Sequence, residues 1–331
     1  MKAPVIGIIG SGSWATALSK LFLNNCESIN WFIRNRADID YFKEYKNNPK
    51  YLSSVDFPVS KINFTDSIIE CVKNSDYLIL TVPSAFLNDT LKNINPEDLK
   101  NKFIFSAIKG IVPEHNLIVG EYLNKIFQVP LQNIGVITGP CHAEEVAMEK
   151  LSYLTIASQN INNAKTVSTL LNCRYLKSTV SDDIYGTEYS AVLKNVIAVA
   201  GGICHGLGYG DNFFAVLVSN AIQEIKRFVD AVHPIDRDIK ASAYLGDLLV
   251  TAYSHFSRNR TFGTMIGKGY SVKNAQLEMN MIAEGYYAVK CVYEINKTYK
   301  VNMPITAAVY EIIYKNKDAK KEMASLSDLL S

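Results

Sequence analysis

Short apolar runs alternate with helix-period segments through the first half of the chain. Runs rich in β-branched and aromatic residues predict strands at Val5–Ile9, Ile29–Ile33, Tyr77–Val82, Phe103–Ala107, Ile134–Thr138, Leu154–Ala157 and Tyr175–Val180. Apolar positions recur at helical spacing over Ala15–Asn24, Ala85–Ile94 and Ala164–Asn172. This alternation favours right-handed crossovers and a mostly parallel sheet, and continuous apolar strands such as YLILTV fit a sheet covered on both faces.

The pattern changes after about Asp182, where strand signals nearly vanish and helix-period segments continue to the C-terminus. We therefore place a domain boundary near Ser181–Asp183. The sequence predicts an α/β domain over residues 1–181 and an all-helical domain over residues 182–331.

The first predicted strand runs into Gly10-x-Gly12-x-x-Ala15 and then into a helix. Gly10 permits the tight turn, Gly12 allows a pyrophosphate to approach the backbone, and Ala15 lets helix and strand pack closely. The helix N-terminus adds N–H groups and the positive end of its dipole. A glycine pattern at the first strand–helix junction of an alternating α/β domain predicts a Rossmann-like dinucleotide-binding domain.

The residues after the second predicted strand bear on the choice between NAD and NADP. NAD-specific sites usually carry an acid there for the ribose hydroxyls, whereas this chain has WFIRNR. Arg34, Asn35 and Arg36 suit a 2′-phosphate, and Arg34 is the stronger candidate because it follows the strand directly. The alternative is that both arginines are ordinary surface charges. Both cofactors therefore stay open.

A lysine interrupts the most apolar helical segment of the second half, in EYSAVLKNVIAVAGG. Lysine is seldom fully buried without a partner, and burial lowers its pKa because the charged form loses hydration. Lys194 is either a functional group held in a dry site or a residue at the helix margin whose ammonium reaches water.

Composition excludes several classes of protein. The 331 residues are 48% hydrophobic and 20% charged, with 34 basic against 32 acidic residues and a net charge of +2. This balance argues against nucleic-acid binding or a polybasic membrane anchor. No apolar run approaches the ~20 residues that span a bilayer, and the first residues do not form a signal peptide. We expect a cytoplasmic protein.

Six scattered cysteines without a C-x-x-C pair are predicted to be free and mostly buried thiols. Cys141 and His142 stand beside Glu144 and Glu145, but no other cluster supplies converging ligands, so we expect no metal site.

Polar groups follow two of the predicted strands, in FSAIKG and ITGPCHAEE, and a third cluster occurs in LGDLLVTAYSHFSRNRTFG. Ligands bind at the carboxyl edge of open α/β sheets, where Lys109 and Gly139 fall. Alone, the Ser-Arg-Asn-Arg stretch is more often the solvated start of a helix. Together with GSGSWATAL, TVPS, LKNVIAVAGG, GYGDN and AEG, these motifs resemble the NAD(P)-dependent glycerol-3-phosphate dehydrogenase family of bacterial type. They run in family order from about Gly7 to about Pro304.

The resemblance implies reversible hydride transfer between NAD(P)H and dihydroxyacetone phosphate, giving sn-glycerol 3-phosphate for phospholipid synthesis. It implies that the helical domain of residues 182–331 is the substrate and catalytic domain. It also implies that Lys194 is the general acid and base, with Lys109, Asp247 and Thr251 as further catalytic residues. The implied substrate-binding residues are Lys109, Gly139, Cys141, Lys194, Asp247, Ser257, Arg258 and Asn259. The implied cofactor-binding residues are Gly10, Gly12, Ser13, Trp14, Arg34, Lys109, Ala143, Arg258, Ile282 and Glu284. The family is also compatible with a homodimer.

The chain departs from the family pattern at a few positions. Cys141 replaces the usual Ser or Thr, and sulfur is a weaker hydrogen-bond partner than a hydroxyl. Tyr185 stands where the family is more apolar, and SAYLGD is a less glycine-rich approach to Asp247.

Two other functions compete with this one. A two-domain dehydrogenase acting on a hydroxy acid or keto acid would share the fold. A dinucleotide-sensing regulator or an inactive homologue is disfavoured, because no DNA-binding module is apparent and Lys194 and Asp247 are both present.

Overall fold

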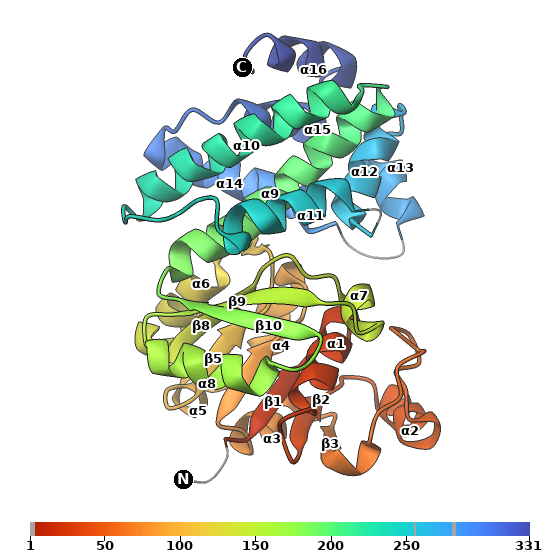
Figure 1. The fold of residues 1–331 in the computed structure, drawn as a ribbon, viewed down its shortest axis with the longest axis vertical. Coiled ribbons are helices and arrows are strands. Elements are labelled where there is room, and N and C mark those ends of the chain that lie inside the picture. The colour runs from red at the N-terminus through yellow and green to blue at the C-terminus, as the bar shows by residue number, and fades with distance from the viewer. Residues whose placement is uncertain (1–3, 255, 280–282) are drawn as a thin grey trace. The chain divides into compact units, whose positions relative to one another are not determined.

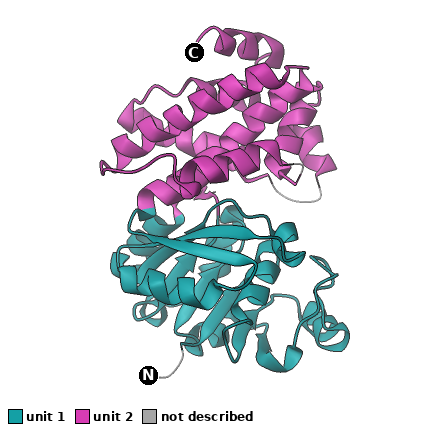
Figure 2. Cartoon of the chain, in the orientation of Figure 1, with its two compact units in different colours: residues 1–108, 119–184 teal, residues 109–118, 185–331 magenta. Residues whose placement is uncertain are grey.

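The computed structural model describes residues 4–254, 256–279 and 283–331. The chain divides into two compact units (Figure 2). Unit 1 contains residues 1–108 and 119–184, and unit 2 contains residues 109–118 and 185–331. The domain limits that the sequence predicts, 1–181 and 182–331, stay a prediction.

Unit 1 is built on an eight-stranded sheet. Its strands, in spatial order, are β10 (Leu176–Ser181), β9 (Ser152–Ser158), β8 (Ile134–Thr138), β5 (Phe103–Ser106), β4 (Tyr77–Leu80), β1 (Ile6–Ile9), β2 (Ile29–Phe32) and β3 (Ile62–Thr65). Neighbouring strands are parallel throughout except β8 and β9, which are antiparallel. The predicted mostly parallel sheet is confirmed, and so are its seven predicted strands. Strand β3 was not predicted, because INFT alternates apolar and polar residues over only four positions and forms no continuous apolar run.

Helices complete unit 1 around this sheet (Figure 1). They are α1 (Ser13–Phe22), α2 (Arg36–Tyr45), α3 (Ile68–Lys73), α4 (Leu87–Leu91), α5 (Pro96–Leu99), α6 (Val119–Phe127), α7 (Ala143–Ala147) and α8 (Ile161–Leu171). The predicted helix over Ala85–Ile94 is wrong in extent, since a 3₁₀ turn at Ser84–Phe86 precedes the short α4. After α4 the chain turns, and the backbone N–H of Ile94 donates a hydrogen bond of 2.9 Å to the carbonyl oxygen of Leu91.

Unit 2 contains the short hairpin β6 (Ile111–Val112) and β7 (Leu117–Ile118) and eight α-helices among the described residues. The helices are α9 (Ile184–Gly206), α10 (Asp211–Val232), α11 (Asp247–Tyr253), α12 (Arg258–Gly267), α13 (Val272–Glu278), α14 (Glu284–Tyr299), α15 (Pro304–Lys315) and α16 (Ala319–Ser327). The predicted helical C-terminal region is confirmed. Across the described part of the chain, none of the helices has the length and apolar character to cross a membrane.

The core of unit 2 forms around α9. Leu193, Val196, Ile197 and Ala200 are at most 1% exposed and belong to one cluster with residues of α10, α11, α12, α14, α15 and α16. Because α9 is enclosed by other helices, any polar side chain in its middle must find a partner within unit 2.

All six cysteines carry free thiols, and all but Cys173 are buried, as predicted. Within residues 4–254, 256–279 and 283–331, no three His, Cys, Asp or Glu side chains are grouped to hold a metal ion.

Candidate active site

Lys194 lies in the middle of the 23-residue helix α9 and is 4% exposed. Its ammonium contacts the carboxylate of Asp247, which is 1% exposed. The structure therefore does not place Lys194 at the helix margin with its ammonium in water. Lys194 is a buried cation that is paired with a buried anion.

Asp247 begins α11, directly after a π-helical turn at Ser242–Gly246. Its Oδ1 also lies 3.4 Å from the Nζ of Lys109. Thr251 is one helical turn further along α11, on the same face as Asp247, and is 5% exposed. The structure thus brings the ammonium groups of Lys109 and Lys194 to the carboxylate of Asp247, so that two positive charges face one negative charge.

Asn195 fixes the backbone of Lys109. Its Nδ2 donates a hydrogen bond of 2.7 Å to the carbonyl oxygen of Lys109, and Asn195 is 5% exposed. Asn195 directly follows Lys194 in LKNVIAVAGG but was not among the predicted site residues. Its position beside Lys194 in an apolar run was the signal that could have identified it.

Burial is the main cause of the pKa shift at Lys194. Burial lowers this pKa, the charge of Asp247 opposes the shift and the charge of Lys109 adds to it, and together they bring the pKa of Lys194 to about 7. Burial alone would raise the pKa of Asp247, but the charges of Lys109 and Lys194 outweigh it, so that pKa lies below its usual value. The site therefore holds an ionised carboxylate beside a lysine that can gain or lose a proton near neutral pH.

Close packing of two helices fixes the start of α12. A β-carbon on Gly263 would lie 2.1 Å from the carbonyl oxygen of Val199, and one on Gly202 would lie 2.2 Å from that of Arg260. Such contacts are impossible for any residue but glycine, so α12 lies directly against α9. The first residues of α12 are thereby held at a fixed position along the helix that carries Lys194.

The Ser-Arg-Asn-Arg stretch forms the N-terminus of α12. Ser257 is the N-cap and accepts a hydrogen bond of 3.3 Å from the backbone N–H of Arg260. Asn259 accepts a hydrogen bond of 2.9 Å from the N–H of Gly285, which joins α12 to the first turn of α14, where Glu284 lies. Arg258 is exposed.

The glycine turn of unit 1 has the geometry that a pyrophosphate needs. Gly10 has φ +127°, a conformation that favours glycine. Gly12 is the N-cap of α1, and no atom lies within 4 Å of the position of a β-carbon on it. No acidic residue occupies the first turn, which contains Ser13 and Trp14. The N-terminus of α1 thus presents backbone N–H groups beside open space, as a dinucleotide site requires.

Other predicted cofactor and substrate residues follow strands of the same sheet. Arg34 comes shortly after β2 and is exposed, and Gly139, with φ +123°, directly follows β8. Cys141 is buried, and Ala143 is the first residue of α7. Because β1, β2 and β8 run in the same direction, the turn at Gly10, Arg34 and Gly139 share the carboxyl edge of the sheet.

The predicted site residues therefore fall into two groups, each within one unit. Unit 1 contains Gly10, Gly12, Ser13, Trp14, Arg34, Gly139, Cys141 and Ala143. Unit 2 contains Lys109, Lys194, Asp247, Thr251, Ser257, Arg258, Asn259 and Glu284. Ile282 lies outside the described residues.

Sheets with this turn bind dinucleotides, and a buried lysine whose pKa is lowered to about 7 suits the reduction of a carbonyl. The fold and the lysine–aspartate group thus define a dehydrogenase with a separate helical unit. Two family models match the chain: the N-terminus of NAD-dependent glycerol-3-phosphate dehydrogenase over residues 5–164 and its C-terminus over residues 183–324. The chain belongs to this family, as the sequence motifs predicted, and is an NAD(P)-dependent oxidoreductase.

Similar proteins cover nearly the whole chain. A glycerol-3-phosphate dehydrogenase [NAD(P)+] of Agathobacter rectalis is 35% identical over 97% of this chain and 95% of its own length. The protein of the same name from Clostridium botulinum is 33% identical over 95% of this chain and 94% of its own. The crystal structure of glycerol-3-phosphate dehydrogenase from Coxiella burnetii has a TM-score of 0.89 at 26% identity, covering 98% of both chains.

A D-mandelate dehydrogenase with NADH has a TM-score of 0.61 at 15% identity, covering 99% of this chain and 100% of that chain. This likeness shows a shared fold alone, so it gives no support to an activity on hydroxy acids.

Proposed function

We propose that the chain catalyses reversible hydride transfer between NAD(P)H and dihydroxyacetone phosphate, giving sn-glycerol 3-phosphate. The buried group of Lys194, Asp247 and Lys109 is the observation that carries this proposal. A carbonyl oxygen gains negative charge as hydride reaches its carbon, and a site with an excess positive charge stabilises that change. The choice of substrate rests on the similar proteins, which are named glycerol-3-phosphate dehydrogenase [NAD(P)+].

Lys194 acts as the general acid in reduction. The cofactor, when bound, supplies the hydride that forms the new C–H bond at the carbonyl carbon. The π electron pair of the C=O bond moves to oxygen and takes a proton from the Nζ of Lys194, leaving the neutral amine. The reverse reaction returns that proton to Lys194. Asp247 holds both lysines in place, and Asn195 fixes the backbone of Lys109.

We assign the remaining residues from the family resemblance. Lys109, Gly139, Cys141, Asp247, Thr251, Ser257, Arg258 and Asn259 serve the substrate. Gly10, Gly12, Ser13, Trp14, Arg34, Lys109, Ala143, Arg258, Ile282 and Glu284 serve NAD or NADP. The proposal includes a cytoplasmic location, a homodimer and the supply of glycerol 3-phosphate for phospholipid synthesis.

The substrate assay tests this function directly. Oxidation of NADH and of NADPH is followed at the nicotinamide absorbance band with dihydroxyacetone phosphate, and in parallel with a 2-keto acid. Sites built for a polar substrate group discriminate strongly against analogues without it, so we expect kcat/KM to favour dihydroxyacetone phosphate by at least about 100-fold. A preference for the keto acid would assign the chain to the hydroxy-acid dehydrogenases.

The replacement Arg258→Lys tests recognition of the substrate phosphate. It keeps the charge but loses the planar fork that binds two phosphate oxygens at once. One charge-assisted hydrogen bond contributes about 1.5–3 kcal/mol, so kcat/KM for dihydroxyacetone phosphate should fall at least about tenfold, mainly through KM. Arg227→Lys on α10, where Arg227 Nε donates to the carbonyl oxygen of Asn302, is the matched control. Equal kinetics for both variants would contradict the role of Arg258.

The pH dependence of the two directions should have opposite signs. Reduction needs the ammonium form of Lys194 and oxidation needs the amine. Because burial lowers the pKa of Lys194 to about 7, kcat/KM for reduction should fall as pH rises through about 7, and kcat/KM for oxidation should rise.

Two variants should move the inflections of these two pH profiles of kcat/KM in opposite directions. Lys109→Met removes a charge that lowers the pKa of Lys194, so both inflections should move to higher pH. Asp247→Asn removes the charge that raises this pKa, so they should move to lower pH. Inflections that stay in place in both variants would show that another group titrates.

A further inference from the structure

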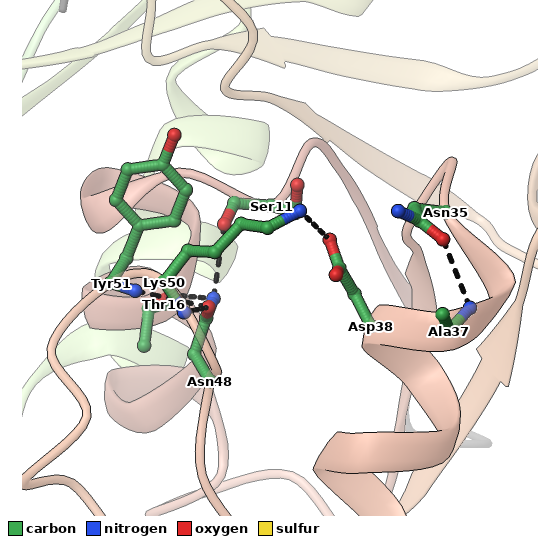
Figure 3. A network of polar contacts seen from close by, with 8 residues as sticks. All are labelled: Ser11, Thr16, Asn35, Ala37, Asp38, Asn48, Lys50 and Tyr51. Atoms are coloured by element: carbon green, nitrogen blue, oxygen red, sulfur yellow. Dashed lines mark hydrogen bonds and ion pairs between the residues drawn. The ribbon is translucent and has the colours of Figure 1, made fainter. Parts of the chain in front are cut away.

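The segment that follows α2 returns to the glycine turn of unit 1, and Asn48 makes the connection (Figure 3). Its Nδ2 donates hydrogen bonds of 3.0 Å to the carbonyl oxygen of Ser11 and of 2.9 Å to the Oγ1 of Thr16. Asn48 is 3% exposed. Both donors of this buried amide are therefore engaged with the segment that precedes and begins α1.

Through these bonds Asn48 holds two successive carbonyl groups of the turn. It binds that of Ser11 directly. Thr16 adds a second link, because its Oγ1 accepts from Asn48 and donates a hydrogen bond of 3.0 Å to the carbonyl oxygen of Gly12, which also accepts from the backbone N–H of Thr16 at 3.0 Å. In a planar trans peptide the C=O and the following N–H point in opposite directions. By fixing the carbonyl of Ser11, Asn48 therefore also fixes the N–H group of Gly12, and the bonds of Thr16 to the carbonyl of Gly12 fix the N–H group of Ser13.

The oxygen of the Asn48 amide accepts hydrogen bonds from the residues that follow it in the chain. Its Oδ1 accepts from the backbone N–H groups of Lys50 at 3.0 Å and of Tyr51 at 3.1 Å. The ammonium of Lys50 then lies 2.7 Å from Asp38 in the first turn of α2 (Figure 3). The segment thus links the glycine turn to the start of the helix that follows β2.

We propose that Asn48 is a positioning residue for the adenosine diphosphate half of the cofactor. The inference rests on the proposed cofactor site and deepens it. Preorganised N–H groups bind an anion without reorganising on binding. Asn48 holds the glycine turn in the orientation in which its N–H groups face the pyrophosphate. Because it acts on backbone groups and not on the 2′ position, its loss weakens NADH and NADPH equally.

Asn48→Ala and Asn48→Asp test this role by titration of NADH, NADPH and ADP-ribose into the intact protein. Asn48→Asp keeps the acceptor for Lys50 and Tyr51 but removes both donors to the glycine turn. We expect both variants to raise the three dissociation constants by a common factor of at least about ten. In steady state the cofactor KM should rise likewise, while kcat at saturating cofactor stays within about threefold.

Asn30→Ala is the matched control. Asn30 is also a buried asparagine of unit 1, 6% exposed, and its Nδ2 donates to the carbonyl oxygen of Asn74 and to the Oγ of Ser75 at the amino end of the sheet. It should lower the melting temperature as Asn48→Ala does but leave the cofactor dissociation constants within about twofold.

Two results would overturn the inference. The first is unchanged ADP-ribose binding in Asn48→Asp, and the second is an equal loss in Asn30→Ala. If Asn48→Ala does not fold, Asn48→Asp and Thr16→Val carry the test, since the first removes both donors to the glycine turn and the second removes the hydroxyl that Asn48 binds in α1. Failure of the proposed function would differ from both, because the wild-type protein would then bind no dinucleotide or turn over no dihydroxyacetone phosphate.

Discussion

Replacing Lys194 with methionine should leave a folded protein that binds NAD(P)H but reduces dihydroxyacetone phosphate about 10²–10⁴-fold more slowly. Methionine roughly preserves the length and apolar volume of the lysine stem in the core around α9. Asp247 keeps an ionic partner, because Lys109 Nζ remains 3.4 Å from its Oδ1. The change therefore removes the proton donor without leaving a buried carboxylate alone. The measurement is kcat at saturating cofactor and substrate.

Lys226→Met is the control for this change. Lys226 is an exposed lysine of α10 that is paired with Asp230 on the surface, so the same substitution there should leave kcat close to that of the wild type. If Lys194→Met folds, binds NADH and keeps more than about a tenth of wild-type kcat, Lys194 does not transfer the proton.

Gly12→Val should abolish tight dinucleotide binding while the fold survives. Gly12 has φ −75° and ψ −178°, an extended conformation open to any residue, and nothing lies within 4 Å of the β-carbon position. A β-carbon at this position therefore fits without a clash, and the valine side chain fills the space where a pyrophosphate would approach α1. Loss of two charge-assisted hydrogen bonds corresponds to at least about 100-fold weaker binding. Fluorescence titration with NADH measures it.

Gly210→Val is the matched control for Gly12→Val. Gly210 is the N-cap of α10, with φ −87° and ψ −179°, and it too has no atom within 4 Å of its β-carbon position. The same substitution in unit 2 should leave NADH affinity unchanged. Equal affinities for wild type and Gly12→Val would show that the turn before α1 does not bind the cofactor.

Most of the sheet could be predicted because its strands are continuous apolar runs, as in β4 and β8, where every residue is buried. The antiparallel pairing of β9 with β8 could not be predicted, since burial of a strand on both faces leaves no periodicity that reports direction. Strand β3 was not predicted because its pairing with β2 decides its structure more than its own sequence does.

The site was predictable to a lesser degree from the residues alone. Lys194 was conspicuous because a charge in an apolar helix needs a partner. The partner, Asp247, lies 53 positions away, and only the fold or the family motifs bring the two together. Asn48 gave no sequence signal, since its buried contacts with Ser11 and Thr16 depend on how the segment after α2 folds back.

The ionisation of Lys194 tests the central claim most directly. With lysine labelled at the ε-carbon by carbon-13, the resonance that is absent from Lys194→Met can be followed by NMR as a function of pH. A buried lysine that serves as acid and base should titrate near pH 7, as burial lowers its pKa to about 7. A midpoint near the ordinary lysine value of about 10.4 would contradict the claim that Lys194 exchanges the catalytic proton at neutral pH.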